Sequence, residues 1–144
     1  MAKQGDIKRW NILIAEDDLT ARAELLKSLY LIAHCTTVAN GQEAIKAYEK
    51  SLKRKQPFDF ILLDVVMPIT DGFDVLRTIR QHEEHQTKIL PQTSRIIMIT
   101  SFKDSLMEHY NMGWDEYITK PIDTNILIKK MAELSNVDLL KTPA

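Results

Sequence analysis

The sequence contains a single cysteine, Cys35, in 144 residues, and it has no excess of either charge. One cysteine excludes both an internal disulfide framework and a zinc site built from cysteines. The 19 lysine and arginine residues are balanced by 20 aspartate and glutamate residues, so the electrostatic basis of a nucleic-acid-binding surface is missing. We therefore expect a chain that does not bind nucleic acid.

Long apolar runs, repeats and low-complexity tracts are absent as well. No run approaches the roughly 18 apolar residues that a membrane-spanning helix needs, and residues 1–6 are polar, unlike a signal peptide. The composition, with 44% hydrophobic and 27% charged residues, is that of an ordinary globular protein. The length fits one domain of about 150 residues. We expect a single cytoplasmic domain with no membrane contact.

Short apolar runs alternate along the chain with segments of helical period. Strands are predicted at Ile12–Ala15, Cys35–Ala39, Phe60–Asp64, Ile96–Thr100 and Glu116–Thr119. Helices are predicted at Leu19–Ile32, Gln42–Leu52, from Phe73 past Ile79, around Ser105–Tyr110 and from Leu127 to Leu134. This alternation predicts an α/β domain with a five-stranded parallel sheet. Right-handed crossovers place helices on both faces of that sheet.

Charged and hydroxyl side chains stand where the predicted strands end. Glu16 and Asp17 follow the first strand, and the third strand ends in Asp64. The fourth strand ends in Thr100, and Lys120 follows the fifth. Ligands of open α/β sheets bind at the carboxyl ends of the strands, so we expect these groups to share one pocket.

The charges of that pocket indicate a metal ion and a phosphoryl group. Three carboxylates this close raise one another's pKa or require counter-ions. Lys120 supplies one positive charge, and a divalent cation brings the pocket to about neutral. Hard oxygen ligands, few of them from the protein, favour Mg²⁺ with retained waters over Ca²⁺ or Zn²⁺. Phosphoryl transfer depends on positioning and charge neutralisation, and a carboxylate such as Asp64 can act as the nucleophile and form an aspartyl phosphate.

Four motifs occur in order at these strand ends: ILIAEDD at 12–18, LDVVMPITDG at 63–72, ITS at 99–101 and YITKP at 117–121. Together they resemble the receiver domains of two-component response regulators, including those similar to chemotaxis regulators. Each motif alone is weak or moderate, but all four in order are highly specific. The resemblance covers 11–134, with 1–10 as an N-terminal extension and 135–144 as a C-terminal tail. It implies a flavodoxin-like (βα)5 fold with strand order 2-1-3-4-5.

The resemblance implies which acidic residue accepts the phosphoryl group and which residues bind the metal ion. Asp64 corresponds to the phosphate-accepting aspartate. Asp17 is expected to bind Mg²⁺ directly and Glu16 through water, with further ligands from Asp64 and the backbone carbonyl of Val66. Asp18 lies one position past the acidic pair and is not expected among the ligands.

The remaining matches concern the phosphoryl oxygens and the switch. Lys120 corresponds to the lysine that pairs with the phosphoryl oxygens, and Thr100 to the hydroxyl that moves toward them. Tyr117 corresponds to the aromatic residue whose position is coupled to that movement. Pro121 and Gly72 match supporting positions of the motifs.

The resemblance also implies partners. The phosphoryl donor is expected to be a histidine kinase or a histidine-containing phosphotransfer protein. Phosphorylation adds roughly −1.5 to −2 charge, and it is expected to switch the face made by the fourth helix, fifth strand and fifth helix, roughly Lys103–Lys130, toward a downstream protein target. No output domain follows, so we expect a stand-alone regulator or a segment of a hybrid kinase or longer regulator.

One departure from the family pattern is spacing. Thr100 follows Asp64 by 36 positions, which is long for a compact receiver domain. The surplus falls in the polar stretch Glu83–Ser94, which we interpret as a surface loop, because such loops tolerate insertion at little cost.

Two other functions have to be weighed against a signalling phosphoacceptor. An aspartate-nucleophile phosphatase normally needs a second acid two residues after Asp64, where Val66 stands. A binding module of the same fold that signals without phosphate has no need of the intact acidic pair, Thr100 and Lys120. We therefore predict a phosphoacceptor that is not an enzyme and contributes only to its own phosphorylation and dephosphorylation.

Overall fold

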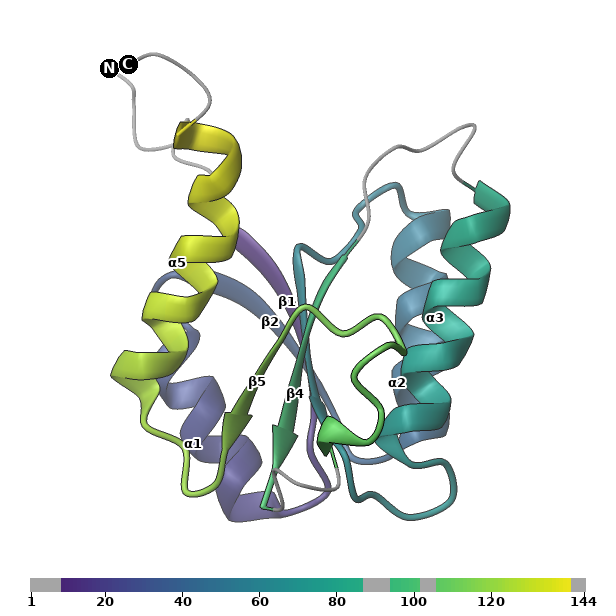
Figure 1. Ribbon diagram of the computed structural model, residues 1–144. Helices are drawn as coiled ribbons and strands as arrows, with labels where there is room; N and C mark the ends of the chain where they lie inside the picture. The colour runs from purple at the N-terminus through teal and green to yellow at the C-terminus, as the bar shows by residue number, and fades with distance from the viewer. Residues whose placement is uncertain (1–8, 87–93, 102–105, 141–144) are drawn as a thin grey trace.

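A five-stranded parallel sheet lies between two layers of helices in the computed structural model, which describes residues 9–86, 94–101 and 106–140 (Figure 1). The strands are β1 (Trp10–Ala15), β2 (Ala33–Val38), β3 (Phe60–Asp64), β4 (Arg95–Thr100) and β5 (Glu116–Thr119). The helices are α1 (Leu19–Leu29), α2 (Gly41–Lys53), α3 (Gly72–Gln86) and α5 (Thr124–Leu140). The sheet order is β2-β1-β3-β4-β5, so the predicted fold class and strand order are confirmed.

The central strands are apolar on both faces because helices cover both. Successive side chains of a strand point to opposite faces of the sheet. Leu13 and Leu63 pack in the cluster shared with α2 and α3, whereas Ile14 and Leu62 pack in the cluster shared with α1 and α5. All four are fully buried. This two-sided burial explains why the strands read as continuous apolar runs rather than as alternating ones.

Each helix begins at a side chain that accepts a backbone N–H of the first turn. These caps are Asp18 for α1, Asn40 for α2, Asp71 for α3 and Asp123 for α5. Aspartate and asparagine are favoured there because the first N–H groups of a helix have no partner within the helix. Two of the caps, Asp18 and Asp71, lie in the loops that follow β1 and β3, so they fix those loops beside the strand ends.

The predicted fourth helix, around Ser105–Tyr110, lies partly outside the described residues and is shorter at its C-terminal end than predicted. The described residues contain the four helices given above and two residues of a further one. Residues 102–105 lie outside the description, and the helical Leu106 and Met107 are followed by turns. His109 N donates to the carbonyl of Leu106, and Met112 N donates to that of His109. These bonds span three residues rather than four, so they close tight turns and do not continue an α-helix.

The polar stretch Glu83–Ser94, interpreted from the sequence as a surface loop, is buried at its two ends, and its first residues belong to α3. The exposed fraction is 9% for Glu83 and 4% for Ser94. Glu83 accepts the N–H of Ser94 at 2.9 Å and pairs with Arg80 at 2.6 Å. Arg80 also pairs with Asp115, just before β5, at 2.8 Å. A carboxylate can be buried here because charged and backbone donors satisfy it; residues 87–93 of the stretch lie outside the described ranges.

Replacing Arg80 is expected to destabilise the fold. Arg80→Met keeps most of the apolar stem but leaves Glu83 and Asp115 without their guanidinium. We expect a loss of about 2 kcal/mol in the free energy of unfolding, less than for a fully buried pair because the three side chains are partly solvated. Urea denaturation followed by circular dichroism measures it.

The matched control is Arg77→Met on the same helix. Arg77 pairs with Asp74 at 2.8 Å, but both side chains are about half exposed, at 53% and 52%. Exposed pairs of this kind contribute less than about 1 kcal/mol. Equal effects of the two substitutions would contradict a structural role for the ion pairs of Arg80 with Glu83 and Asp115.

No helix of the described ranges combines the length and the apolar character needed to cross a bilayer.

Candidate functional site

Two adjacent strand ends bring three carboxylates together. β1 pairs with β3 in a register that sets Ala15 beside Leu63, so the residues that follow, Glu16 and Asp64, are neighbours. Ligand oxygens of Glu16, Asp17 and Asp64 all lie within 4.8 Å of one another. Glu16 is 0% exposed and Asp64 3%, whereas Asp17 faces solvent. Glu16, Asp17 and Asp64, which the sequence predicts at one edge of the sheet, therefore lie close enough together to bind one metal ion.

Lys120 reaches the same point from the end of β5. Its Nζ lies 3.0 Å from Asp64 Oδ2 and 3.2 Å from Glu16 Oε1. The backbone holds it there, because Lys120 N donates to the carbonyl of Thr100 at 2.9 Å. One ammonium group thus joins two buried carboxylates that lie 48 positions apart in the sequence, and Thr100 lies next to it at the end of β4.

The pKa values of Glu16 and Lys120 are both raised, but for different reasons. Burial raises the pKa of Glu16 above its ordinary value and the Asp64 carboxylate adds to the rise, while a hydrogen bond from Asp18 N–H and the charge of Lys120 oppose it. Burial alone lowers the pKa of Lys120, but the hydrogen bond and charge of Asp64, together with Glu16, outweigh burial and raise it. Lys120 therefore stays charged at neutral pH, and the pocket remains short of positive charge.

Backbone donors and one arginine fix the carboxylates in place. Val66 N donates to Asp64 Oδ1 at 3.1 Å, and Asp18 N donates to Glu16 Oε2 at 3.0 Å. The guanidinium of Arg22 donates to the backbone carbonyl of Glu16 at 2.8 Å. Sequence reasoning missed Arg22. The available signal was its position in the first turn of the helix after the acidic pair, which turns it back toward the strand end.

Gly72 lets the loop after β3 close against the site. Its N–H donates to the carbonyl of Val65 at 2.9 Å. A Cβ at this position would lie 2.3 Å from the carbonyl oxygen of Asp64 and 2.8 Å from Val65 Cα. Both atoms are backbone, so no side chain can move aside. The glycine of the third strand's motif is therefore required by close contact with the acceptor residue itself.

Three of the remaining predicted residues lie in or just after β4 and β5, and Val66 lies in the loop after β3. Thr100 is 3% exposed and stands beside Thr119 in the β4–β5 register. Tyr117 lies farther from the strand end, half-buried, with its ring 5.8 Å from the Trp114 ring in an edge-to-face contact and 5.8 Å from Lys130 Nζ. Pro121 follows Lys120 through a cis peptide bond. Val66 shows 69% of its surface to solvent at the rim of the pocket.

The residues present fit a magnesium ion. Three carboxylates share one ammonium group, which leaves two negative charges uncompensated among the described ion pairs. Glu16 Oε1 is buried and has no hydrogen-bond partner among the described residues; its contact with Lys120 Nζ at 3.2 Å is an ion pair. Oxygen donors with one open, solvent-facing carboxylate match the preference of Mg²⁺ for few protein ligands and several waters.

The comparisons with known proteins agree with the fold and the motifs. A family model described as the response regulator receiver domain matches residues 12–132. Among solved structures, the chain is similar to the receiver domain of the response regulator Ssk1 of Saccharomyces cerevisiae, crystallised with the histidine phosphotransfer signalling protein Ypd1. That likeness has a TM-score of 0.74 and 25% identity, and it covers 87% of this chain and 88% of the other.

Curated relatives are mostly longer proteins. The transcriptional regulatory protein AfsQ1 of Streptomyces coelicolor is 34% identical over 120 residues, which are 81% of this chain and 47% of the relative. The hybrid signal transduction histidine kinase I of Dictyostelium discoideum is 31% identical over 120 residues, 81% of this chain and 7% of the relative. The chain thus spans half or less of the length of these relatives.

Proposed function

Because this chain belongs to the response regulator receiver domain family of two-component signalling, we propose that it accepts a phosphoryl group on Asp64 from a phosphohistidine protein. The observation that carries the proposal is the contact of Lys120 with both Asp64 and Glu16 in a buried pocket at the strand ends. A salt bridge that only stabilised the fold would need one carboxylate to pair with the Lys120 ammonium group. Three carboxylates around one ammonium leave a charge deficit that suits a divalent cation and a phosphoryl group.

In the proposed reaction a carboxylate oxygen of Asp64 attacks phosphorus in line with the phosphorus–nitrogen bond of the donor. The new oxygen–phosphorus bond forms as the phosphorus–nitrogen bond breaks. The imidazole of the donor leaves with the electron pair and takes up a proton. Lys120 then pairs with the phosphoryl oxygens, and the hydroxyl of Thr100 donates a hydrogen bond to them. The product is an acyl phosphate on Asp64.

Magnesium would be held by Asp17, Asp64 and the backbone carbonyl of Val66, with Glu16 acting through water. When bound, the ion neutralises negative charge on the phosphoryl oxygens and on the carboxylates. The protein itself orients Asp64 through the hydrogen bond from the Val66 N–H and keeps the charged Lys120 beside it. The exposed Asp17 leaves one side of the pocket open for the donor.

The signal would pass through the β4 and β5 edge. Movement of the Thr100 hydroxyl toward a phosphoryl group vacates space that Tyr117 can fill, which would alter the face made by β5, α5 and the segment before them. Of the stretch Lys103–Lys130 proposed as this face, 103–105 lie outside the described residues. The phosphotransfer protein bound to the similar Ssk1 receiver domain supports a donor of that class. We place the reaction in the cytoplasm.

The direct test is binding of beryllofluoride, a stable mimic of the phosphoryl group. We expect one equivalent to bind in the presence of Mg²⁺, measured by isothermal titration calorimetry, and none when the metal is removed with EDTA. Lys120→Met is expected to weaken this binding by about tenfold or more, because a charge-assisted bond is lost in a buried site. Metal-independent binding, or none at all, would refute the proposal.

Magnesium alone is expected to stabilise the protein. At 10 mM Mg²⁺ we expect an increase of about 1–2 kcal/mol in the free energy of unfolding, because the ion binds the folded carboxylate cluster and not the unfolded chain. Differential scanning calorimetry should show a Tm about 3–6 °C higher. Asp17→Asn is expected to remove most of this shift.

Asp18→Asn is the matched control for Asp17→Asn. It removes the same charge one residue away, and asparagine caps a helix as well as aspartate does. We expect it to leave the magnesium effect unchanged. Equal losses in both variants would mean that Mg²⁺ responds to the general negative field of the loop and is not bound by Asp17.

A further inference from the structure

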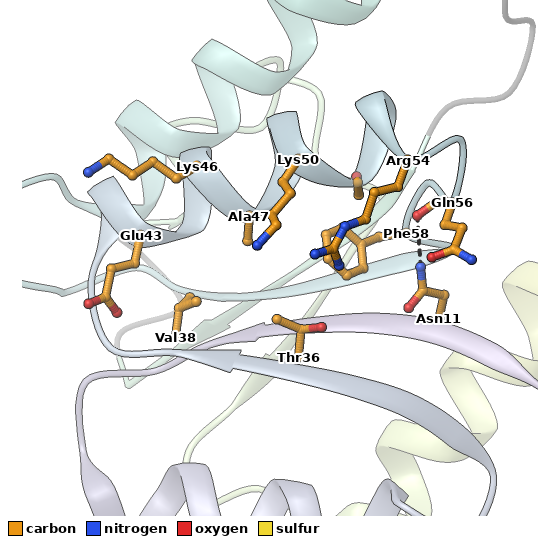
Figure 2. Close-up of a pocket in the computed structure, with 11 residues that line it drawn as sticks. Asn11, Thr36, Val38, Glu43, Lys46, Ala47, Lys50, Arg54, Gln56 and Phe58 are labelled. Carbon is orange, nitrogen blue, oxygen red and sulfur yellow. Dashed lines mark hydrogen bonds between the residues drawn. The ribbon is translucent and has the colours of Figure 1, made fainter.

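A basic groove runs between α2 and the edge strand β2, away from the acidic pocket. It is a cavity of about 380 Å³, and its lining includes Lys46 and Lys50 of α2 and Arg54, the C-cap residue of that helix, at intervals of four positions. Figure 2 shows Lys50 and Arg54 extending from α2 toward Thr36 on β2. In the described part of the chain no carboxylate forms an ion pair with any of the three. The acidic lining residue, Glu43, is engaged by the N–H of Ala39 at the start of α2.

The other wall of the groove is an open sheet edge. β2 is the first strand in the sheet order and pairs with β1 alone among the described strands. Its outward-facing backbone N–H and C=O groups are therefore available to a further strand. Thr36 is exposed although its side chain faces α2, because the helix does not extend over the strand edge. Val38 and Phe58 supply apolar surface to the groove.

The spacing of the cations matches one kind of ligand. Four residues of an α-helix rise about 6 Å, so the backbone positions 46, 50 and 54 recur at about that interval along α2 and its C-cap. Alternate residues of an extended strand are about 6.6 Å apart and point to the same side. A strand lying beside β2 with an acid at every second position can therefore place one carboxylate under each cation.

We propose that this groove binds an extended acidic segment of a partner protein, which adds to β2 as a sixth strand. Its alternate aspartate or glutamate side chains pair with Lys46, Lys50 and Arg54, and its backbone bonds to the free edge of β2. The charge complementarity and the matched repeat select an acidic strand, and the open edge favours a peptide over other polyanions.

The experiment measures binding of fluorescein-labelled octapeptides to the whole chain by fluorescence anisotropy. One peptide alternates glutamate and valine, and a second has the same composition with the four glutamates in one block. We expect the alternating peptide to bind about tenfold more tightly, a difference of about 1.4 kcal/mol. A thymidine oligonucleotide of equal charge tests the competing class of ligand. Equal binding of the block peptide or the oligonucleotide, or no binding of the alternating peptide up to about 1 mM, overturns the proposal.

Two further measurements test whether the peptide adds to β2 as a strand and whether it pairs with the cations of α2. Alternating peptides methylated on the backbone nitrogens of odd or of even positions should differ, because every second N–H of an added strand faces the sheet. One set should lose binding and the other keep it. Lys50→Glu should weaken binding about five- to tenfold, since an attraction becomes a repulsion.

Lys129→Glu is the control for charge. It makes the same change at an exposed lysine of α5, on the opposite face of the sheet. An effect equal to that of Lys50→Glu would show a long-range field instead of a groove. Asp64→Asn should leave peptide binding unchanged, so failure of the groove proposal and failure of the phosphoacceptor proposal can be told apart.

Discussion

Asp64→Asn is expected to abolish acceptance of the phosphoryl group. The amide that replaces the carboxylate is the same size but lacks the negative charge and the nucleophilic oxygen. We expect transfer of radioactive label from a phosphorylated histidine phosphotransfer protein to fall by more than about a thousandfold, as for other losses of an attacking group. Gel electrophoresis of the labelled chain measures it, and lability of the wild-type label to hydroxylamine identifies an acyl phosphate.

The same substitution separates chemistry from folding. Asp64 is one of three carboxylates around a single ammonium group, so its neutralisation relieves repulsion in the absence of metal. We therefore expect Asp64→Asn to be at least as stable as the wild-type chain without Mg²⁺. Asp74→Asn, an equal change at an exposed position on α3, should keep full labelling. Retention of label in Asp64→Asn would place the acceptor on another residue.

The pocket could be predicted from sequence because a parallel sheet imposes a simple rule on it. The carboxyl ends of all strands meet at one edge, so residues as distant as Glu16 and Lys120 could be assigned to one place before their contact at 3.2 Å was known. The fold followed from the same regularity. Apolar runs of four to six residues, each ending on a polar side chain, mark strands that are buried on both faces.

Features that depend on partners distant in the sequence could not be predicted in this way. The burial of Glu83 depends on Arg80, which is held in turn by Asp115, and no local pattern joins them. The role of Arg22 depends on the exact turn by which α1 leaves β1. The segment at 106–112 has helical composition, yet after the helical Leu106 and Met107 its backbone forms successive turns before Gly113, which has a positive φ of 106°.

The basic groove was hidden from sequence reasoning for another reason. The cluster around Arg54 has the appearance of a solvated helix end, and its neighbours Lys46 and Lys50 are spread along a helix of mixed charge. The row of cations at 46, 50 and 54 forms one wall of a groove only because β2 is an edge strand. The edge position of β2 follows from the sheet order and cannot be inferred from the residues of α2.

Gly72→Ala is expected to have the largest effect on stability among these substitutions. Alanine normally favours a helix over glycine by about 1 kcal/mol, and Gly72 is the first residue of α3. The opposite sign is expected here, because the new Cβ would lie 2.3 Å from the backbone oxygen of Asp64. Relief requires moving the start of α3 away from β3. We expect a loss of about 3 kcal/mol, as for overpacking against atoms that cannot yield.

Thermal unfolding should show this as a Tm lower by about 6–12 °C. Gly113→Ala is the comparison, because there the new Cβ meets a side-chain atom of Arg80 at 3.2 Å instead of backbone, and the main cost comes from the positive φ of 106°; we expect about 1–2 kcal/mol. The two variants should differ more in their binding of beryllofluoride at the pocket than in their stability. Displacement of the Asp64 backbone should weaken beryllofluoride binding in Gly72→Ala, whereas Gly113→Ala should bind as the wild-type chain does. If Gly72→Ala were instead stabilised by its helix propensity, the close contact between α3 and the acceptor residue would not exist in solution.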